Sequence, residues 1–121
     1  MNIDWSQLIT RDMKEAAAAV ARLNEAQALL TRRNEAAATQ ISRIQDRVET
    51  LGYGIDAGAA TPQDEAEQRT LVEGLKAWKT YKFNLGNVPR QAGWPVSPDW
   101  PAPPAIPEIS AVPEQAVGSP A

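Results

Sequence analysis

Apolar residues recur at alternating spacings of three and four along the first part of the chain. This spacing is a heptad repeat, which favours a coiled-coil seam over the broader stripe of a helix in a globular core. The a positions hold Met13, Val20, Gln27, Asn34, Ile41 and Val48, and the d positions hold Ala16, Leu23, Leu30, Ala37, Ile44 and Leu51. We therefore predict a long N-terminal helix that begins at about Thr10, a suitable N-cap, and stops at Gly52 and Gly54.

Polar residues interrupt the middle of this seam. Gln27 and Asn34 occupy consecutive a positions. One polar residue at a often fixes register, and Asn34 by itself favours a parallel dimer, but two in a row also fit a bend near Asn34 that makes a helical hairpin. The stripe then serves either self-association or packing within the chain. The residues that would serve self-association are Val20, Leu23, Leu30, Asn34, Ile41, Ile44 and Val48.

A second helix is expected after a Gly/Ala linker over residues 52–60. Thr61 and Pro62 suit the N-cap and first helical position, and Asp64 lies at N3, where an acid completes the cap. One face then carries Leu71, Leu75, Trp78 and Leu85, and Gly86 is expected to end the helix.

The remainder of the chain, residues 87–121, holds nine of the ten prolines and cannot form a regular helix or a central strand. Trp94 and Trp100 lie among the prolines of its first half, which predicts an extended strap on a surface. The fold class expected is mainly α, divided into residues 1–51, the linker 52–60, the second helix with its strap over 61–105, and a disordered tail over 106–121.

The composition of the chain excludes several classes of function. The chain has no cysteine and no histidine, so disulfides, thiolate nucleophiles, imidazole bases and the usual zinc sites are excluded. No constellation of other residues marks a catalytic, cofactor or metal site, and an enzyme is not expected. The net charge of −3 argues against a nucleic-acid partner. No apolar run reaches the ~20 residues of a membrane span. An acid and no basic residue at the start argue against a signal peptide, so a cytoplasmic protein is expected.

The C-terminal part contains an ordered series of aromatic and proline residues. The expected second helix contributes Trp78, Tyr81 and Leu85. Two short motifs follow it, Trp94-Pro95 and then Trp100-Pro101 with Pro103 two residues later. This ordered set resembles the C-terminal signature of bacteriophage tail-fibre assembly and tail assembly chaperone proteins, over roughly 30 residues. Two positions depart from the family pattern. Lys82 replaces a common arginine, which weakens a two-pronged carboxylate contact to a point-charge one, and Trp94 replaces a common phenylalanine.

The resemblance implies a helper that binds a phage, prophage or tail-like bacteriocin fibre and assists its folding or trimerisation without nucleotide hydrolysis. It would act in the bacterial host cytoplasm or stay on the assembled particle. The candidate fibre contacts are Trp78, Tyr81, Lys82, Trp94 and Trp100, with aromatics as typical binding anchors. The alternative is that these aromatics pack on one another as a small core. A structural coiled-coil subunit of the tail or baseplate is the rival function, and a Pro-rich adaptor is a third.

Overall fold

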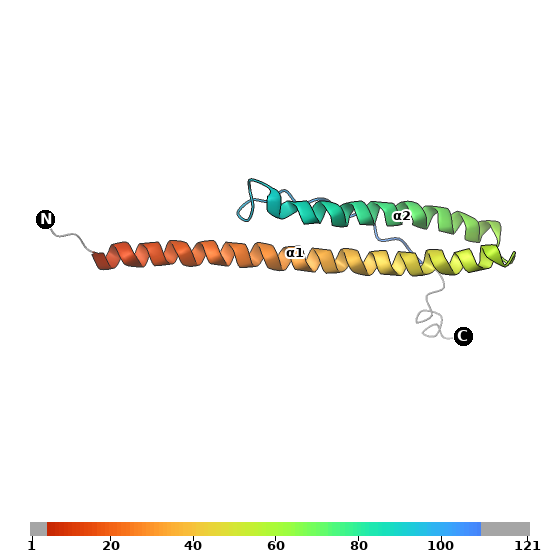
Figure 1. Ribbon diagram of the computed structural model, residues 1–121, viewed down its shortest axis with the longest axis horizontal. Helices are drawn as coiled ribbons and strands as arrows, with labels where there is room; N and C mark the ends of the chain where they lie inside the picture. The colour runs from red at the N-terminus through yellow and green to blue at the C-terminus, as the bar shows by residue number, and fades with distance from the viewer. Residues whose placement is uncertain (1–4, 110–121) are drawn as a thin grey trace, which may run out of the picture.

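The computed structural model describes residues 5–109, and in that part of the chain it is mainly α, as predicted. Helix α1 spans Trp5–Asp56, α2 spans Pro62–Asn87, and a single 3-10 turn, η1, spans Val88–Arg90. No strand occurs within these residues. Residues 91–109 form turns and then an extended segment. Figure 1 shows α2 folded back along the second half of α1, so that the two helices make an antiparallel hairpin.

Helix α1 is continuous, which corrects the alternative of a break near Asn34. Its 52 residues correspond to roughly 78 Å at 1.5 Å per residue, twice the length of α2. It begins at Trp5 rather than at Thr10, and it passes through Gly52 and Gly54 to end at Asp56. A glycine within a helix costs only about 1 kcal/mol. Leu51, which comes just before these glycines, is buried in the core and holds this end of α1 against α2.

The reversal between the helices occupies residues 57–61. Gly58 has a φ of +71°, a left-handed conformation that glycine adopts without a steric penalty. The carbonyl of Gly54 accepts hydrogen bonds from the amides of Ala59 and Ala60, at 2.9 and 3.1 Å. These bonds satisfy a carbonyl at the end of α1 that has no partner within the helix.

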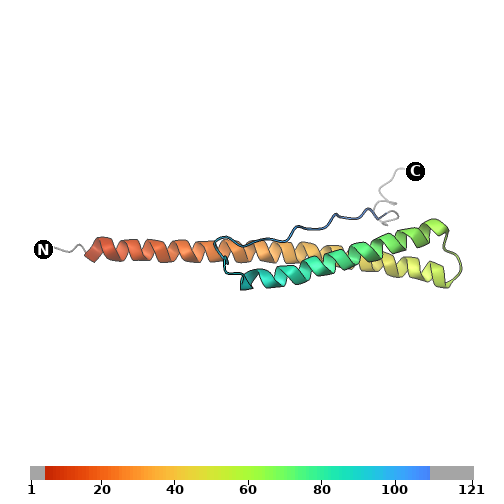
Figure 2. The same ribbon diagram turned by 90° about the horizontal axis from the view of Figure 1, so that it is seen from above.

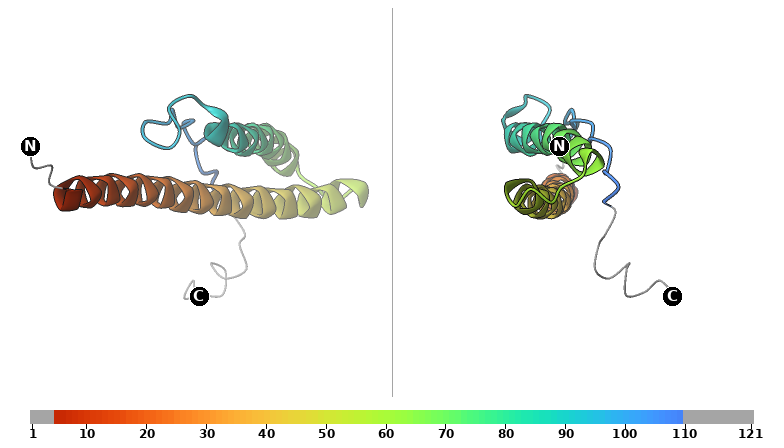
Figure 3. Two further views of the ribbon diagram at one scale, coloured as in Figure 1. Left: turned by 60° about the vertical axis from the view of Figure 1, so that its left-hand side comes forward. Right: turned by 90° about the vertical axis from the view of Figure 1, so that its right-hand side faces the viewer.

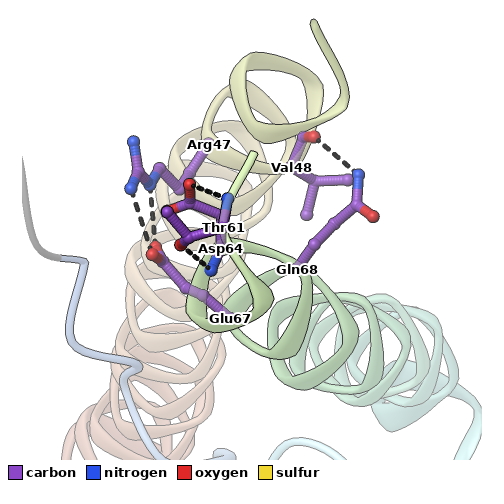
Figure 4. A network of polar contacts seen from close by, with 6 residues as sticks. All are labelled: Arg47, Val48, Thr61, Asp64, Glu67 and Gln68. Carbon is purple, nitrogen blue, oxygen red and sulfur yellow. Dashed lines mark hydrogen bonds and ion pairs between the residues drawn. The ribbon is translucent and has the colours of Figure 1, made fainter. Parts of the chain in front are cut away.

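The start of α2 follows the predicted cap. The Thr61 hydroxyl accepts a hydrogen bond from the Asp64 amide at 3.1 Å, and the Asp64 carboxylate accepts one from the Thr61 amide at 2.9 Å. Figure 4 shows these two reciprocal bonds, which form a capping box. Hydrogen bonds from the Thr61 backbone and then from its side chain lower the pKa of Asp64, because they stabilise the ionised carboxylate. The end of α2 lies at Asn87, one residue beyond the expected Gly86.

The hydrophobic core lies along the d positions of α1. Ala37, Ile44 and Leu51 are buried, seven residues apart, and Leu30 packs against the same cluster. The facing side chains of α2 are Leu71, Trp78, Tyr81 and Leu85, with Leu75 partly buried. The heptad spacing therefore predicts the correct face of α1, but that face packs against a helix of the same chain.

Polar contacts fix the register of the two helices near the turn. The Arg47 guanidinium donates to both carboxylate oxygens of Glu67, at 2.7 and 3.0 Å, and the Gln68 amide donates to the Val48 carbonyl at 3.2 Å (Figure 4). The hydrogen bond to Glu67 raises the pKa of Arg47, and desolvation opposes it. Because a two-pronged contact needs both planar groups aligned, it opposes sliding of α2 along α1.

Within residues 5–109, no element covers the first part of α1. Every residue from 11 to 22 is exposed, and we call this stretch the uncovered segment. It includes two large apolar residues of the heptad stripe, Met13 at 66% and Val20 at 56% exposure. Figures 1 and 2 show this part of α1 projecting beyond the end of α2. Along the hairpin the stripe is buried, and along the uncovered segment it faces outward.

We expect Thr61→Ala to destabilise the hairpin by about 1 kcal/mol, because it removes the hydroxyl that caps α2. Urea unfolding followed by circular dichroism would measure this loss. Thr70→Ala is the matched control, since Thr70 is an exposed residue within the same helix. Equal stability of the two variants would contradict a stabilising role for the cap.

Candidate partner-binding surface

The loop after α2 builds a small aromatic surface, which we call the aromatic corner: Trp94, Pro95, Val96 and Trp100. The indole rings of Trp94 and Trp100 meet edge to face, with centroids 6.2 Å apart. Both side chains are half-buried, and Val96 is 67% exposed. Paired indoles that keep part of their surface in water are the type of group that dominates protein–protein binding energies.

Backbone contacts hold this loop in a defined shape. The Gln91 side chain donates to the Asp99 carbonyl at 2.8 Å and accepts from the Asp99 amide at 2.6 Å, which closes the loop at its base. Within it, the Ser97 amide donates to the Gly93 carbonyl at 2.7 Å. A Cβ at Gly93 would lie 2.3 Å from the Ser97 carbonyl oxygen, so this turn requires glycine.

Helix α1 supports the corner from beneath. The Arg33 guanidinium carbon lies 4.9 Å from the centroid of the Trp100 ring, a cation–π contact. A shallow cavity of about 190 Å³ lies between the loop and the helix. Its lining includes Arg22, Glu25, Ala26 and Leu29 on α1 and Pro95, Val96, Pro98 and Trp100 on the loop. The corner therefore lies where the covered part of α1 meets the uncovered segment.

The segment after the corner returns beside both helices. Figure 2 shows it running back along the hairpin, and the end-on view in Figure 3 places it to one side of α1 and α2. The Trp78 indole donates to the Ala105 carbonyl at 3.2 Å, and Arg43 donates to the Pro107 carbonyl at 2.9 Å. Ile109 is buried in the core. Pro107 and Ile109, which fall in the expected disordered tail, thus contact the helices, and residues 110–121 lie outside the described residues.

The five candidate fibre contacts separate into three groups. Trp78 and Tyr81 are only 3% and 5% exposed, and their rings pack edge to face at 5.5 Å, so they offer almost no surface to a partner. Lys82 is exposed and donates to the Asn34 side chain at 3.2 Å. Trp94 and Trp100 form the half-exposed corner. The aromatics thus make one internal pair and one half-buried pair, of which Trp100 also packs against the core.

The residues suggested for self-association also separate. Ile44 is buried in the hairpin, and Leu30, Ile41 and Val48 pack against its core, so their packing is within the chain. Asn34 accepts a hydrogen bond from Lys82 of α2, which gives this polar a position a partner inside the hairpin. Leu23 is half-buried. Of the seven, only Val20 is exposed.

Sequence reasoning missed several members of this surface. Arg33 and Gln91 hold the corner, and Val96 supplies its most exposed apolar side chain. The only sequence signal for Arg33 is its place beside the heptad stripe, and the role of Gln91 depends on loop geometry that no motif encodes. Outside the corner, Phe83 of α2 is also a large exposed apolar residue, at 72% exposure.

No group of three or more acidic side chains in residues 5–109 could hold a metal ion. Neither helix, within those residues, combines the length and apolar character needed to cross a membrane. In comparisons with known proteins, no family model, no curated protein and no solved structure gives a significant match.

We expect Gly93→Ala to distort the aromatic corner while leaving the helices intact. The added methyl group would overlap the Ser97 carbonyl, and crowding of this kind typically costs about 1–3 kcal/mol. Near-ultraviolet circular dichroism should report a change in the part of the indole signal that the Trp94–Trp100 pair contributes, with the helical far-ultraviolet signal unchanged.

Gly86→Ala is the matched control, because a Cβ there meets no atom within 4 Å. It should leave the indole signal intact and stabilise α2 by up to about 1 kcal/mol. An unchanged indole signal in Gly93→Ala would contradict the requirement for glycine in the turn.

Proposed function

We propose that this chain is an assembly chaperone for a phage tail fibre, which binds the fibre without catalysis and assists its folding or trimerisation. The observation that carries the proposal is the aromatic corner. It offers Trp94, Trp100 and Val96 on one preformed loop. Preformed aromatic anchors bind with little loss of conformational entropy.

The positions that resemble the tail-fibre assembly signature support this assignment through two different roles. Trp78, Tyr81 and Leu85 belong to the hydrophobic core. Trp94 and Trp100 form the half-buried aromatic corner, in which Trp100 also packs against the core. The signature therefore specifies both a scaffold and an exposed loop, which is the combination that a binding module needs.

The electrostatics favour contact through apolar area and hydrogen bonds. The cavity beside the corner is lined by one cation, Arg22, and one anion, Glu25, so it carries no strong field of one sign. The indole N–H groups of Trp94 and Trp100 can donate directional hydrogen bonds to the carbonyls of a polypeptide. A folding or unassembled fibre chain exposes both apolar side chains and backbone carbonyls.

The rival function is a structural subunit of the tail or baseplate. The observation that favours it is the uncovered segment, a projecting helix suited to permanent packing with other subunits. A structural subunit must be present in fixed proportion in purified particles, whereas a chaperone that leaves after assembly must be absent from them. Quantitative mass spectrometry of purified particles distinguishes these two outcomes.

We expect soluble fibre trimer to form only when this chain is present. The experiment is co-expression with the adjacent tail-fibre gene, with and without this protein, followed by size-exclusion chromatography with light scattering. If the fibre assembles equally well alone and nothing co-elutes with it, the chaperone proposal is wrong.

We expect Trp94→Ala and Trp100→Ala each to weaken fibre binding by roughly thirtyfold, the equivalent of a 2 kcal/mol anchor residue. Helix content should stay near that of the wild type, because both indoles lie outside the helices, although Trp100→Ala should also lower stability since Trp100 packs against the edge of the core. Binding would be measured by biolayer interferometry against purified fibre, and helix content by circular dichroism.

Tyr53→Ala is the control for loss of an exposed aromatic ring, since Tyr53 lies at the opposite end of the hairpin and is 62% exposed. It should bind as the wild type does. If the tryptophan variants lose helix in proportion to binding, the indoles act as core residues and the aromatic corner is not the contact surface.

A further inference from the structure

The last described segment of the chain, residues 101–109, lies along the hairpin, and we call it the docked strap (Figure 2). Its burial repeats every three residues. Pro101, Pro104 and Pro107 are half-buried, and the two residues after each of the first two prolines are exposed. An α-helix repeats after roughly 3.6 residues and a strand after two, whereas a polyproline II helix repeats after three. The docked strap therefore lies with one edge of a polyproline II helix against the hairpin.

The amino-acid sequence favours this conformation by itself. Proline fixes its own φ at about −65° and restricts the preceding residue to extended backbone. Between Trp100 and Pro107, Ala105 alone is neither a proline nor a residue that precedes one. Within residues 5–109, no backbone–backbone hydrogen bond joins the docked strap to either helix. Because polyproline II has no internal hydrogen bonds either, its carbonyls can accept from side-chain donors.

Side chains of both helices supply such donors. The Trp78 indole of α2 donates to the Ala105 carbonyl at 3.2 Å, and the Arg43 guanidinium of α1 donates to the Pro107 carbonyl at 2.9 Å. Ile109 then enters the hydrophobic core. Neither hydrogen bond depends on the side chain of the accepting residue. A preformed polyproline II backbone against an aromatic side chain is the combination by which binding domains recognise proline-rich polypeptides.

We propose that this side of the hairpin is a polyproline II-binding groove, which takes a proline-rich segment of another polypeptide in exchange for the docked strap. The docked strap defines the ligand that fits. Such a ligand has prolines three residues apart, one carbonyl for Trp78, a second carbonyl two residues later for Arg43, and an apolar side chain beyond them. The strap is then an internal competitor, and a ligand binds only as far as it displaces the strap.

The attachment of the docked strap suits exchange. Both hydrogen bonds of Gln91 to Asp99 close the preceding loop at its base, so the loop keeps its anchor when residues 101–109 leave the helices. The docked strap has one fully buried side chain, Ile109, and is held by side-chain donors. Segments with few buried apolar contacts open at a lower free energy than the core of a protein. An incoming segment with the same pattern would cover the same part of the core.

The test is binding of a fluorescein-labelled synthetic peptide with the sequence of residues 101–109 to the full chain, followed by fluorescence polarisation. In the wild type this peptide competes with a tethered strap of high effective concentration. Ile109→Ser removes the buried anchor from the tethered strap, while the peptide keeps its own. We therefore expect the variant to bind the peptide more tightly than the wild type does, by roughly tenfold or more.

Pro104→Gly in the full chain is a second variant that leaves Ile109 in the core. Glycine widens the range of backbone conformations open to the free strap, so the tethered strap docks less favourably. This variant should also bind the peptide more tightly than the wild type does. The test therefore does not depend on the stability of the Ile109→Ser protein.

Two altered peptides test the three-residue spacing. The Pro104→Glu peptide carries a charge on the edge that lies against the hairpin, and it should bind roughly tenfold more weakly or worse. The Pro103→Glu peptide is the matched control, because the same charge then lies at the neighbouring exposed position. It should bind as the unaltered peptide does. The two altered peptides have the same composition and the same net charge.

The Trp78 indole N–H reports where the peptide binds, because it donates to the docked strap. In a proton–nitrogen correlation spectrum of Ile109→Ser, its signal should move away from the wild-type position as the strap opens. Addition of the unaltered peptide should return the signal towards that position.

Three results would overturn the proposal. The first is that the peptide binds to neither variant. The second is equal binding of the two altered peptides, which would show contact without the three-residue spacing. The third is binding that leaves the Trp78 signal unmoved, which would place the peptide elsewhere. No fibre enters these experiments, so their outcome is independent of the proposed chaperone function.

Discussion

The structure depends on one stripe of residues along α1 and on how much of it is covered. α1 has 52 residues and α2 has 26, so a single return pass can bury only half of the stripe. Where α2 lies on it, Ala37, Ile44 and Leu51 are buried. Where α2 has ended, Val20 and Met13 face outward. Burial of apolar area is the dominant stabilising term, so the hairpin end is the stable unit and the other end is open to association.

Alanine side chains are small, so a chain rich in alanine needs larger residues to fill its core. Here Trp78 and Tyr81 supply it on α2, and the proline-rich segment covers the side that a third helix would cover in a bundle. Prolines have no amide to donate, so this segment cannot join a sheet, and its carbonyls need donors from outside. Trp78 and Arg43 provide them at Ala105 and Pro107. Through these bonds the internal aromatic pair and the strap stabilise one another.

Much of the fold could be predicted from sequence, because it is encoded in local patterns. The heptad spacing gives the buried face of α1, and Thr61, Pro62 and Asp64 give the start of α2 through their own chemistry. The heptad spacing does not distinguish packing against another molecule from packing against the same chain, since a helix presents the same face in both cases. The end at Asp56 and the role of Ile109 depend on contacts between distant residues, which override local propensities. The role of Gln91 could not be predicted for the same reason, since it depends on the bonds that its side chain makes to Asp99.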